Sequence, residues 1–395
     1  KVVDAERLNL HVSTHSRPHL ATMSFDELRP FLHTRPDRPS LVPYRHTFYT
    51  DGWGFCLSHD QLDAMQRADA GPYEVCIDAD LEDADDALLY GECELPGTDD
   101  AGEVVFSAHS CHPSMANDNL SGVVVQAYLA QWLAQRPAPN PGAWRPTYRF
   151  VFAPATVGVL AWLHNNRDRL PRIIGGATLA NVGDAAPLAY RLSRQGDTAI
   201  DRAAASVLPA DRIGGFDPTG GDERQFGSPG LNLPVGALMR SAPGAYPEYH
   251  TSADDETFVT PDALAGTLDA CVAICEAIEA GGPAVATTQP STAGMLPVSP
   301  GCPVNRVGYG EPQLGKYGIL EAVRAQPDPA AIYRAVLWTL NLADGRHDLA
   351  AMAKRSGFPL PVIQQAASLL ERFELIEVQP ETSAAPDSRA AGVNP

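Results

Sequence analysis

The chain of 395 residues predicts an α/β protein with a mostly parallel sheet, helices on both faces of that sheet, a small inserted β domain and a C-terminal winged helix. Between residues 99 and 281, apolar strand-like runs alternate with helical patterns, which is typical of a parallel sheet covered on both faces. Residues 44–98 contain short β-type segments. Residues 313–378 contain three helical patterns and then a strand, in the order of a winged helix.

The region 44–98 predicts the inserted β domain. Its segments are bounded by turn signals such as Asp51-Gly52 and Ala70-Gly71. The expected strands are 44–49, 53–57, 73–77 and 87–95.

The region 99–281 predicts the main sheet. The expected strands are 104–108, 150–154, 173–180 and 233–239, and the expected helices are 119–135, 157–170, 201–208 and 262–280. In sheets of this kind ligands gather beyond the carboxyl ends of the strands. We therefore expect a functional site in the loops that follow these strands.

The C-terminal part begins after a stretch rich in Pro, Thr, Ser and Gly. Its expected helices are 331–342, 348–355 and 360–373, and its expected strand is 375–379. The predicted organisation is an α/β domain (1–43 and 99–281), the β domain (44–98), a linker (282–304), the winged helix (305–380) and a flexible tail (381–395).

Composition excludes some classes of partner. With 29 basic and 48 acidic residues the net charge is −19, which argues against binding to nucleic acid or to anionic lipid. No apolar run reaches the roughly 18 residues that cross a bilayer. Seven scattered cysteines without CxxC spacing favour a cytoplasmic protein without disulfides. The chain starts at Lys1 without a signal-peptide pattern, so we expect a trimmed N-terminus.

The densest group of reactive side chains is the segment HSCHPSMANDNLSG, residues 109–122. His109, His112 and Asp118 lie in it between an expected strand and an expected helix. Imidazole and carboxylate are common ligands of catalytic zinc, which takes three protein ligands and keeps one position open. The alternative is that Asp118 only caps the helix, where the dipole stabilises its charge, and that the histidines are ordinary loop residues.

A second polar loop, 248–255, precedes the expected helix 262–280. His250 would supply the third zinc ligand, with Asp254 or a hydroxyl fixing its tautomer, and Tyr249 would contact the substrate. The alternative is that His250 is an exposed bystander.

A third segment, 220–226, reads GGDERQF. Asp222, Glu223 and Arg224 would bind substrate there, with Arg224 facing a carboxylate or Glu223 facing an amine. The alternative is a solvated turn.

Five segments carry a family resemblance. They are HSCHPSMANDNLSG (109–122), YPEYHTSADDE (246–256), GGDERQFGSPGLNLPVG (220–236), WGFCLSHDQ (53–61) and EPQLGKYG (311–318). With them the chain resembles the DUF4910 aminopeptidase-like family, which is related to the M28 zinc aminopeptidases and the glutaminyl cyclases. The resemblance covers residues 1–378. It implies an M28-like α/β domain, an inserted β domain of the DUF2172 type and a C-terminal winged helix.

The resemblance also implies a metal site. His109, Asp118 and His250 match three M28 metal ligands, and His112 is the extra histidine of the DUF4910-type motif. The preferred set is His112, Asp118 and His250 around one Zn²⁺, with His109 as a neighbour or a fourth ligand. The M28 pattern has another acidic ligand after the third strand, but the segment 179–182 reads LANV, so a second metal is not expected.

The segment 153–158 departs from the family, because Ala155 stands where related sequences have the glutamate that M28 enzymes use as general base. Zinc-dependent hydrolysis needs a group that takes the proton of the attacking water. We expect either that Glu223 or Glu248 has taken over this catalytic role, or that the reaction is not ordinary peptide hydrolysis. Cys111, between two histidines, is a weaker candidate nucleophile and is more simply a small buried residue.

The winged helix lacks the charge of a nucleic-acid-binding module. Residues 332–378 hold five basic and five acidic residues, and the expected recognition helix 360–373 carries only Arg372 as a basic residue. We therefore expect a packing or oligomerisation element.

The first hypothesis for function is an aminopeptidase-like, zinc-dependent hydrolase that acts on an amide or peptide-like small molecule. The resemblance suggests a biosynthetic pathway for a polysaccharide or a peptide natural product. The alternatives are an acyl-transfer, cyclising or condensing enzyme that uses the same zinc site, and a non-catalytic binding or scaffold protein. The expected partners are the small substrate and, in a homo-oligomer, a second copy of the chain. Nucleic acid and membrane are not expected partners.

Overall fold

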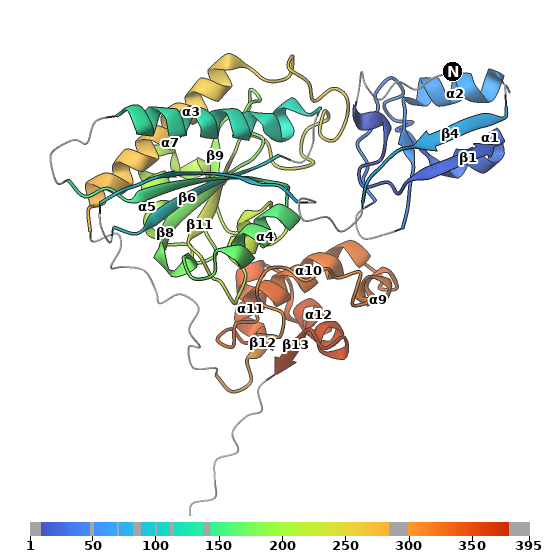
Figure 1. Ribbon diagram of the computed structural model, residues 1–395. Coiled ribbons are helices and arrows are strands. Elements are labelled where there is room, and N and C mark those ends of the chain that lie inside the picture. The colour runs from blue at the N-terminus through green and yellow to red at the C-terminus, as the bar shows by residue number, and fades with distance from the viewer. Residues whose placement is uncertain are drawn as a thin grey trace, which may run out of the picture. The chain divides into compact units, whose positions relative to one another are not determined.

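The computed structural model describes residues 9–47, 51–68, 71–81, 88–98, 101–110, 114–136, 143–283 and 299–378 (Figure 1). The chain forms two compact units. The first comprises Lys1–Gly227 with Asn232–Thr292, and the second comprises Ser228–Leu231 with Ala293–Pro395. Within the described residues, no helix is long and apolar enough to cross a membrane.

A seven-stranded sheet forms the centre of the first unit, in the order β10-β9-β11-β8-β6-β7-β5. Its strands are β5 (Gly91–Leu95), β6 (Glu103–His109), β7 (Thr147–Ala153), β8 (Ile173–Leu179), β9 (Ala189–Arg191), β10 (Ile213–Gly214) and β11 (Val235–Met239). The central strands β11, β8, β6 and β7 are parallel, whereas β5 pairs with β7 and β9 pairs with β11 in the antiparallel sense. The predicted mostly parallel sheet is confirmed.

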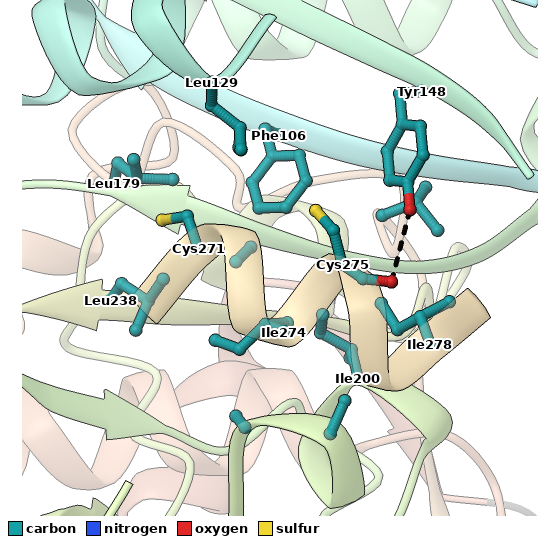
Figure 2. Close-up of a cluster of buried hydrophobic side chains, with 14 of the residues drawn as sticks. Phe106, Leu129, Tyr148, Leu179, Ile200, Leu238, Cys271, Ile274, Cys275 and Ile278 are labelled. Atoms are coloured by element: carbon teal, nitrogen blue, oxygen red, sulfur yellow. Dashed lines mark hydrogen bonds between the residues drawn. The ribbon is translucent and has the colours of Figure 1, made fainter. Parts of the chain in front are cut away.

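One face of the sheet is covered by α3 (Ser121–Gln135), α5 (Ala199–Val207) and α7 (Pro261–Gly281). Apolar side chains from these helices and from the strands form one buried cluster, part of which Figure 2 shows. Phe106 of β6 lies opposite Phe150 of β7 in the strand register, and their rings stack at 5.8 Å between centroids. This cluster fixes the central strands, and with them the loops at their carboxyl ends.

The other face is covered by α4 (Val157–Asn165) and the short α6 (Glu223–Phe226). Figure 1 shows α3 and α7 on one side of the sheet and α4 on the other. Trp162 of α4 and Phe226 of α6 are both buried, with 6.1 Å between their ring centroids. Helices therefore cover both faces, as the α/β pattern predicts. The short α6 and the strands β9 and β10 were not predicted.

The N-terminal part of the first unit is built from short elements. They are a 3₁₀ turn (Asn9–His11), β1 (His19–Met23), α1 (Phe25–Leu28), β2 (Leu32–His33), β3 (Phe55–Cys56), α2 (His59–Ala68) and β4 (Tyr73–Ile77). Strand β1 pairs with β4, and β2 pairs with β3. A small apolar core, which includes Leu32, Leu57 and Leu62, holds them together.

This strand pairing differs from the predicted parts in two respects. Residues 19–33 were assigned to the α/β domain, but they pair with residues 55–77, so they belong to the small β-containing part. Strand β5 was predicted as the last strand of the inserted domain 44–98, but it is an edge strand of the large sheet. The helix α2 was also missed, because its apolar residues lie between two strand-like segments.

The second unit contains α9 (Ile319–Arg324), α10 (Pro329–Leu342), α11 (Leu349–Ser356), α12 (Leu360–Arg372), β12 (Pro303–Asn305) and β13 (Ile376–Val378). Strands β12 and β13 pair in the antiparallel sense. The three expected helices and the final strand are confirmed. The first residues of β12 lie inside the predicted linker 282–304, and the predicted tail 381–395 lies outside the described residues.

Candidate functional site

The candidate site begins where strand β6 ends. His109 is the last residue of β6, and the chain returns through the turn Ala116–Leu120 before α3. Asp118 lies in this turn with only 3% of its surface exposed. His109 Nε2 lies 2.9 Å from Asp118 Oδ1. The strand-to-helix connection therefore brings the first predicted histidine and the carboxylate into direct contact.

His250 completes the group from a segment more than a hundred residues away. Its Nε2 atom lies 3.1 Å from Asp118 Oδ2. One buried carboxylate thus stands between two imidazoles, with one oxygen directed to each ring. His109, Asp118 and His250 come together as predicted.

Buried hydrogen bonds fix the loop that carries Asp118. The backbone N–H groups of Asn117 and Asp118 donate to the two carboxylate oxygens of Asp254, at 2.6 and 3.1 Å. The side-chain amide of Asn117 donates to Asp184 at 2.9 Å. The sequence suggested that Asp254 fixes the tautomer of His250. The Asp254 carboxylate instead accepts hydrogen bonds from the backbone at Asp118. It therefore positions Asp118 rather than His250.

Asn119 connects the same loop to strand β8. Its Nδ2 donates to the carbonyl of Leu179 at 2.8 Å, and its Oδ1 accepts from the N–H of Asn181 at 3.1 Å. Helix α3 has no side-chain cap, so the alternative in which Asp118 only caps this helix is wrong. Sequence reasoning missed the part that Asn119 plays, although its position directly after Asp118 was a signal.

The acidic pair at the start of α6 is buried rather than solvated. Asp222 is 7% exposed and Glu223 is 1% exposed, so the alternative of a solvated turn is wrong. Asp222 Oδ1 accepts the backbone N–H of Thr156 at 2.8 Å. Glu223 lies 3.4 Å from the Arg191 guanidinium. Asp222 thus contacts the residue that directly follows Ala155.

Electrostatics link the acidic pair to the histidine. Burial by itself lowers the pKa of His109, but the hydrogen bond and the charge of Asp118 outweigh it, and with Asp222 and Glu223 they raise the pKa above its ordinary value. Burial raises the pKa of Asp222, with the charge of His109 opposing it. Burial also raises the pKa of Glu223, against the charge of Arg191. The site therefore holds more buried negative charge than its nearby positive groups neutralise.

The remaining predicted residues are placed as follows. The ring of Tyr249 stacks on that of His250, with 3.9 Å between centroids. Arg224 is half-buried, and its charge lowers the pKa of Asp222 against the effect of burial. Among the described residues, the side chain of Glu248 makes no hydrogen bond or ion pair; its carbonyl accepts from Thr251. Cys111 and His112 lie outside the described residues.

The side chains of His109, Asp118 and His250 are chemically suitable ligands for zinc. Two imidazoles and a carboxylate are ligands of catalytic zinc sites. As they stand, no three or more His, Cys, Asp or Glu side chains of the described residues are grouped to hold a metal. Instead, His109 is hydrogen-bonded to the Asp118 carboxylate, and His250 lies within ion-pair distance of its other oxygen.

Fold and site together define an α/β protein with an aminopeptidase-like domain and a C-terminal winged helix. The chain belongs to the DUF4910 family, a domain of unknown function, whose model matches residues 34–281. A winged helix-turn-helix model matches residues 302–378. The family resemblance and the fold class predicted from the sequence are thereby confirmed.

Relatives extend the match over nearly the whole chain. A candidate polysaccharide biosynthesis protein with an aminopeptidase-like domain, from Clostridium acetobutylicum, is 37% identical over 382 residues, which are 96% of this chain and 81% of the relative. A crystal structure of a candidate peptidase from the same species has a TM-score of 0.64 at 35% identity, over 95% of this chain and 80% of the other. An aminopeptidase from Aneurinibacillus sp. strain AM-1 matches at 19% identity and a TM-score of 0.37, over 53% of this chain and 50% of the other.

Proposed function

We propose that the chain is a zinc-dependent hydrolase that cleaves an amide in a small molecule. The observation that supports this proposal best is the Asp118 carboxylate between His109 and His250, at the carboxyl end of a central parallel strand. Ligands of such sheets bind at that end. Buried charges of this kind are rarely retained for stability, because burying them without full compensation destabilises the folded state.

Three described residues would hold the metal: Asp118 and His250, with His109 as the second imidazole. The sequence prediction preferred His112 to His109 as this imidazole, and His112 lies outside the described residues. Zinc bound there supplies a Lewis acid that polarises the amide carbonyl and lowers the pKa of a coordinated water. The hydrogen bonds from the backbone N–H groups of Asn117 and Asp118 to Asp254 keep the Asp118 carboxylate in place before a metal or substrate binds.

Ala155 leaves the usual base position without a proton acceptor, and we assign this role to Asp222. Its carboxylate accepts from the N–H of Thr156, next to Ala155, and its charge acts on both His109 and Asp118. Glu223, one of the two predicted bases, accepts from Gly221 N–H and pairs with Arg191. That pairing makes it the better group for keeping Arg191 and the turn in position. The predicted role of Glu248 lacks a contact that supports it.

The substrate is proposed from chemistry and from the relative. A polysaccharide pathway offers amides chiefly as N-acyl groups on sugars, so we propose an N-acylated sugar or a sugar bearing an amino-acid amide. Arg224 would contact an anionic group of it, and Tyr249, which stacks on His250, would border the reacting carbonyl. These two roles follow the sequence prediction.

A second candidate reaction is favoured by Ala155 itself. An enzyme without the base glutamate activates water less well, whereas an amine nucleophile needs less help from a base. In that case the same zinc site would transfer or cyclise an acyl group, with the substrate amine attacking the carbonyl. Product analysis distinguishes the two: hydrolysis incorporates ¹⁸O from labelled water into the released carboxylate, and amine attack does not.

The second unit is proposed to serve packing or self-association rather than nucleic-acid binding. The recognition-type helix α12 carries Arg372 as its basic residue, and this guanidinium lies 5.4 Å from the centre of the Phe373 ring. We also propose a cytoplasmic location, since the described cysteines are all free thiols, as expected in a reducing compartment.

The deciding experiment is metal analysis of purified protein, with His109→Ala and His250→Ala as variants and His347→Ala as matched control. His347 pairs with Asp344 in the second unit, far along the chain from the site. We expect about one zinc ion per chain in the wild type and the control, and a loss in both site variants. Wild-type protein that takes up no zinc, even when zinc is supplied, contradicts the proposal.

The role of Asp222 is tested once an N-acyl sugar or dipeptide substrate is found by screening. We expect Asp222→Asn to lower kcat by roughly 10²- to 10⁴-fold with zinc retained. Glu223→Gln should have a smaller effect. If Glu223→Gln lowers kcat more than Asp222→Asn does, Glu223 is the general base instead.

A further inference from the structure

A short segment of the N-terminal part, residues 42–44, lies against residues 250–252. Three hydrogen bonds join the two segments: Tyr44 N–H donates to the His250 carbonyl at 2.8 Å, Ser252 N–H donates to the Val42 carbonyl at 2.8 Å, and Val42 N–H donates to Ser252 Oγ at 3.1 Å. Pro43 and Thr251 form an antiparallel bridge between them. The backbone of His250 is therefore held by a segment 206 positions earlier in the chain.

The same segment also contacts the imidazole. The ring of Tyr44 meets that of His250 edge to face, with 4.9 Å between centroids. Tyr249 stacks on the His250 ring at 3.9 Å. Because aromatic pairs prefer such offset or edge-to-face arrangements, the two tyrosines restrict the rotation of the imidazole. Its Nε2 atom is left directed at Asp118.

Tyr44 also connects the two ligand-bearing loops. It is 6% exposed and belongs to a buried cluster with Val42, Cys56 and Met115. Met115 is fully buried and comes three residues before Asp118. Tyr44 thus packs on His250 and shares a buried cluster with Met115, just before the turn that carries Asp118.

His250 needs this support because of its backbone. Its φ angle of 54° lies in the left-handed region, which is unfavourable for a residue other than glycine. Such a conformation persists only where neighbouring contacts hold it. The bond from Tyr44 N–H to the His250 carbonyl is one of these contacts.

We propose that residues 42–44 are the positioning element of His250, and that Tyr44 is the positioning residue that orients its imidazole for zinc. This inference depends on the zinc site proposed above. It assigns to the N-terminal part a direct role in the metal site. Residues that orient metal ligands typically change metal affinity by 10- to 100-fold when they are removed.

The test measures zinc affinity of the full chain by competition with a chromophoric chelator, and the visible spectrum of the cobalt-substituted protein. Tyr44→Ala should weaken zinc binding by roughly 10- to 100-fold and change the cobalt spectrum. Tyr44→Phe keeps the ring and should bind zinc within about twofold of the wild type. Ser252→Ala removes only the bond to Val42 and should have an intermediate effect. Tyr128→Ala, at an exposed tyrosine of α3, is the control for loss of an aromatic residue.

The outcomes separate this inference from the proposed function. If His250→Ala loses zinc affinity while Tyr44→Ala and Ser252→Ala keep that of the wild type, the positioning role is overturned and the zinc site stands. If His250→Ala keeps its affinity, the zinc site itself is wrong. If Tyr44→Ala does not fold, Tyr44→Phe and Ser252→Ala decide. Intact affinity in Tyr44→Phe with weakened affinity in Ser252→Ala supports positioning, and intact affinity in both overturns it.

Discussion

Strand β6 connects two clusters of charge that differ in how their charges are balanced. Its first residue, Glu103, bonds to Arg149 of β7, and its last residue, His109, bonds to Asp118. Arg149, Glu103 and Asp118 are all buried, and Glu103 and His109 lie six positions apart on the same strand. The cluster at Arg149 has the composition of a structural ion-pair network, whereas the cluster at His109 has that of a candidate functional site.

The cluster at Arg149 is neutralised by its own residues. The guanidinium, 1% exposed, bonds to Glu103 at 2.8 Å, to Glu94 at 2.7 Å and also to Glu92. Arg169 lies 2.8 Å from Glu94 and Arg172 lies 3.2 Å from Glu103. Three arginines thus meet three glutamates across strands β5, β6 and β7 and the segment before β8. Such a network satisfies the donors and acceptors that a buried charge requires.

The cluster at His109 has a surplus of acid. Among the described residues it contains the carboxylates of Asp118, Asp222, Glu223 and Asp254, with Arg191 and Arg224 as the nearby arginines. Burial raises the pKa of Asp222, Glu223 and Asp254 against the hydrogen bonds and positive charges that lower it. Protonated imidazoles or a bound cation would restore the balance. By this comparison, the cluster at His109 is the candidate site, and the cluster at Arg149 supports the fold.

The largest effect is expected from Arg149→Met. It removes the cation and leaves Glu103 buried at 3% exposure without its main partner. Breaking a buried ion pair on one side typically costs 3–5 kcal/mol. We expect the free energy of unfolding to fall by about that amount in urea denaturation.

The control is Arg324→Met, whose pair with Glu321 is exposed at both ends. Exposed pairs contribute about 0–1 kcal/mol, so this variant should be nearly neutral. Adding Glu103→Met to Arg149→Met should recover part of the loss, because it removes the unpaired carboxylate. A cost below about 1 kcal/mol for Arg149→Met would show that the cluster does not support the fold.

The sequence predicted the central strands and long helices because their signals are local. The strand that became β8 and the helix that became α7 are apolar patterns of ordinary length, and burial against each other confirms them. Short elements carry too few residues for a pattern, which explains why β10 and the four-residue α6 were missed. Strand β5 was found but placed in the wrong part, because pairing with β7 cannot be read from a segment alone.

The site was predictable where reactive residues stand together in the sequence. His109 and Asp118 lie nine positions apart, and the loop of His250 is rich in polar side chains. The contacts of Tyr44 with His250 and of Asp222 with Thr156 join residues that are distant in the chain. Their side chains are ordinary in their local sequence, so no pattern indicates either contact. Such positioning contacts arise only when the fold brings separate loops together.

An intermediate effect on the free energy of unfolding is expected when zinc is added. The cation would neutralise excess negative charge in the cluster at His109 and leave the cluster at Arg149 unchanged. A ligand at 100 times its dissociation constant stabilises the folded state by about 2.7 kcal/mol. We expect a gain of this order when zinc is added to metal-free wild type and to Arg149→Met, measured by urea denaturation. His250→Ala should show no gain. Equal gains in all three proteins would locate the zinc elsewhere.

The smallest effect is expected from Asp222→Asn in the metal-free protein, where the surplus is uncompensated. The pKa of Asp222 is raised in the folded state, so the folded form binds its proton more tightly than the unfolded form. Stability therefore falls as the pH rises from the unfolded pKa near 3.8 through the raised value. Asparagine is neutral throughout and can still accept from Thr156 N–H through its side-chain oxygen.

The variant should thus be more stable than the wild type by about 1 kcal/mol at pH 8, and the difference should vanish near pH 4. Chemical denaturation with a chelator present, at several pH values, measures it. Asp255→Asn is the opposite control, because hydrogen bonds with Thr257 lower the pKa of Asp255, so this substitution should cost stability at pH 8. If Asp222→Asn destabilises the protein at pH 8 as Asp255→Asn does, the charge of Asp222 is compensated in the folded state. The contrast between the two ends of β6 would then rest on geometry alone.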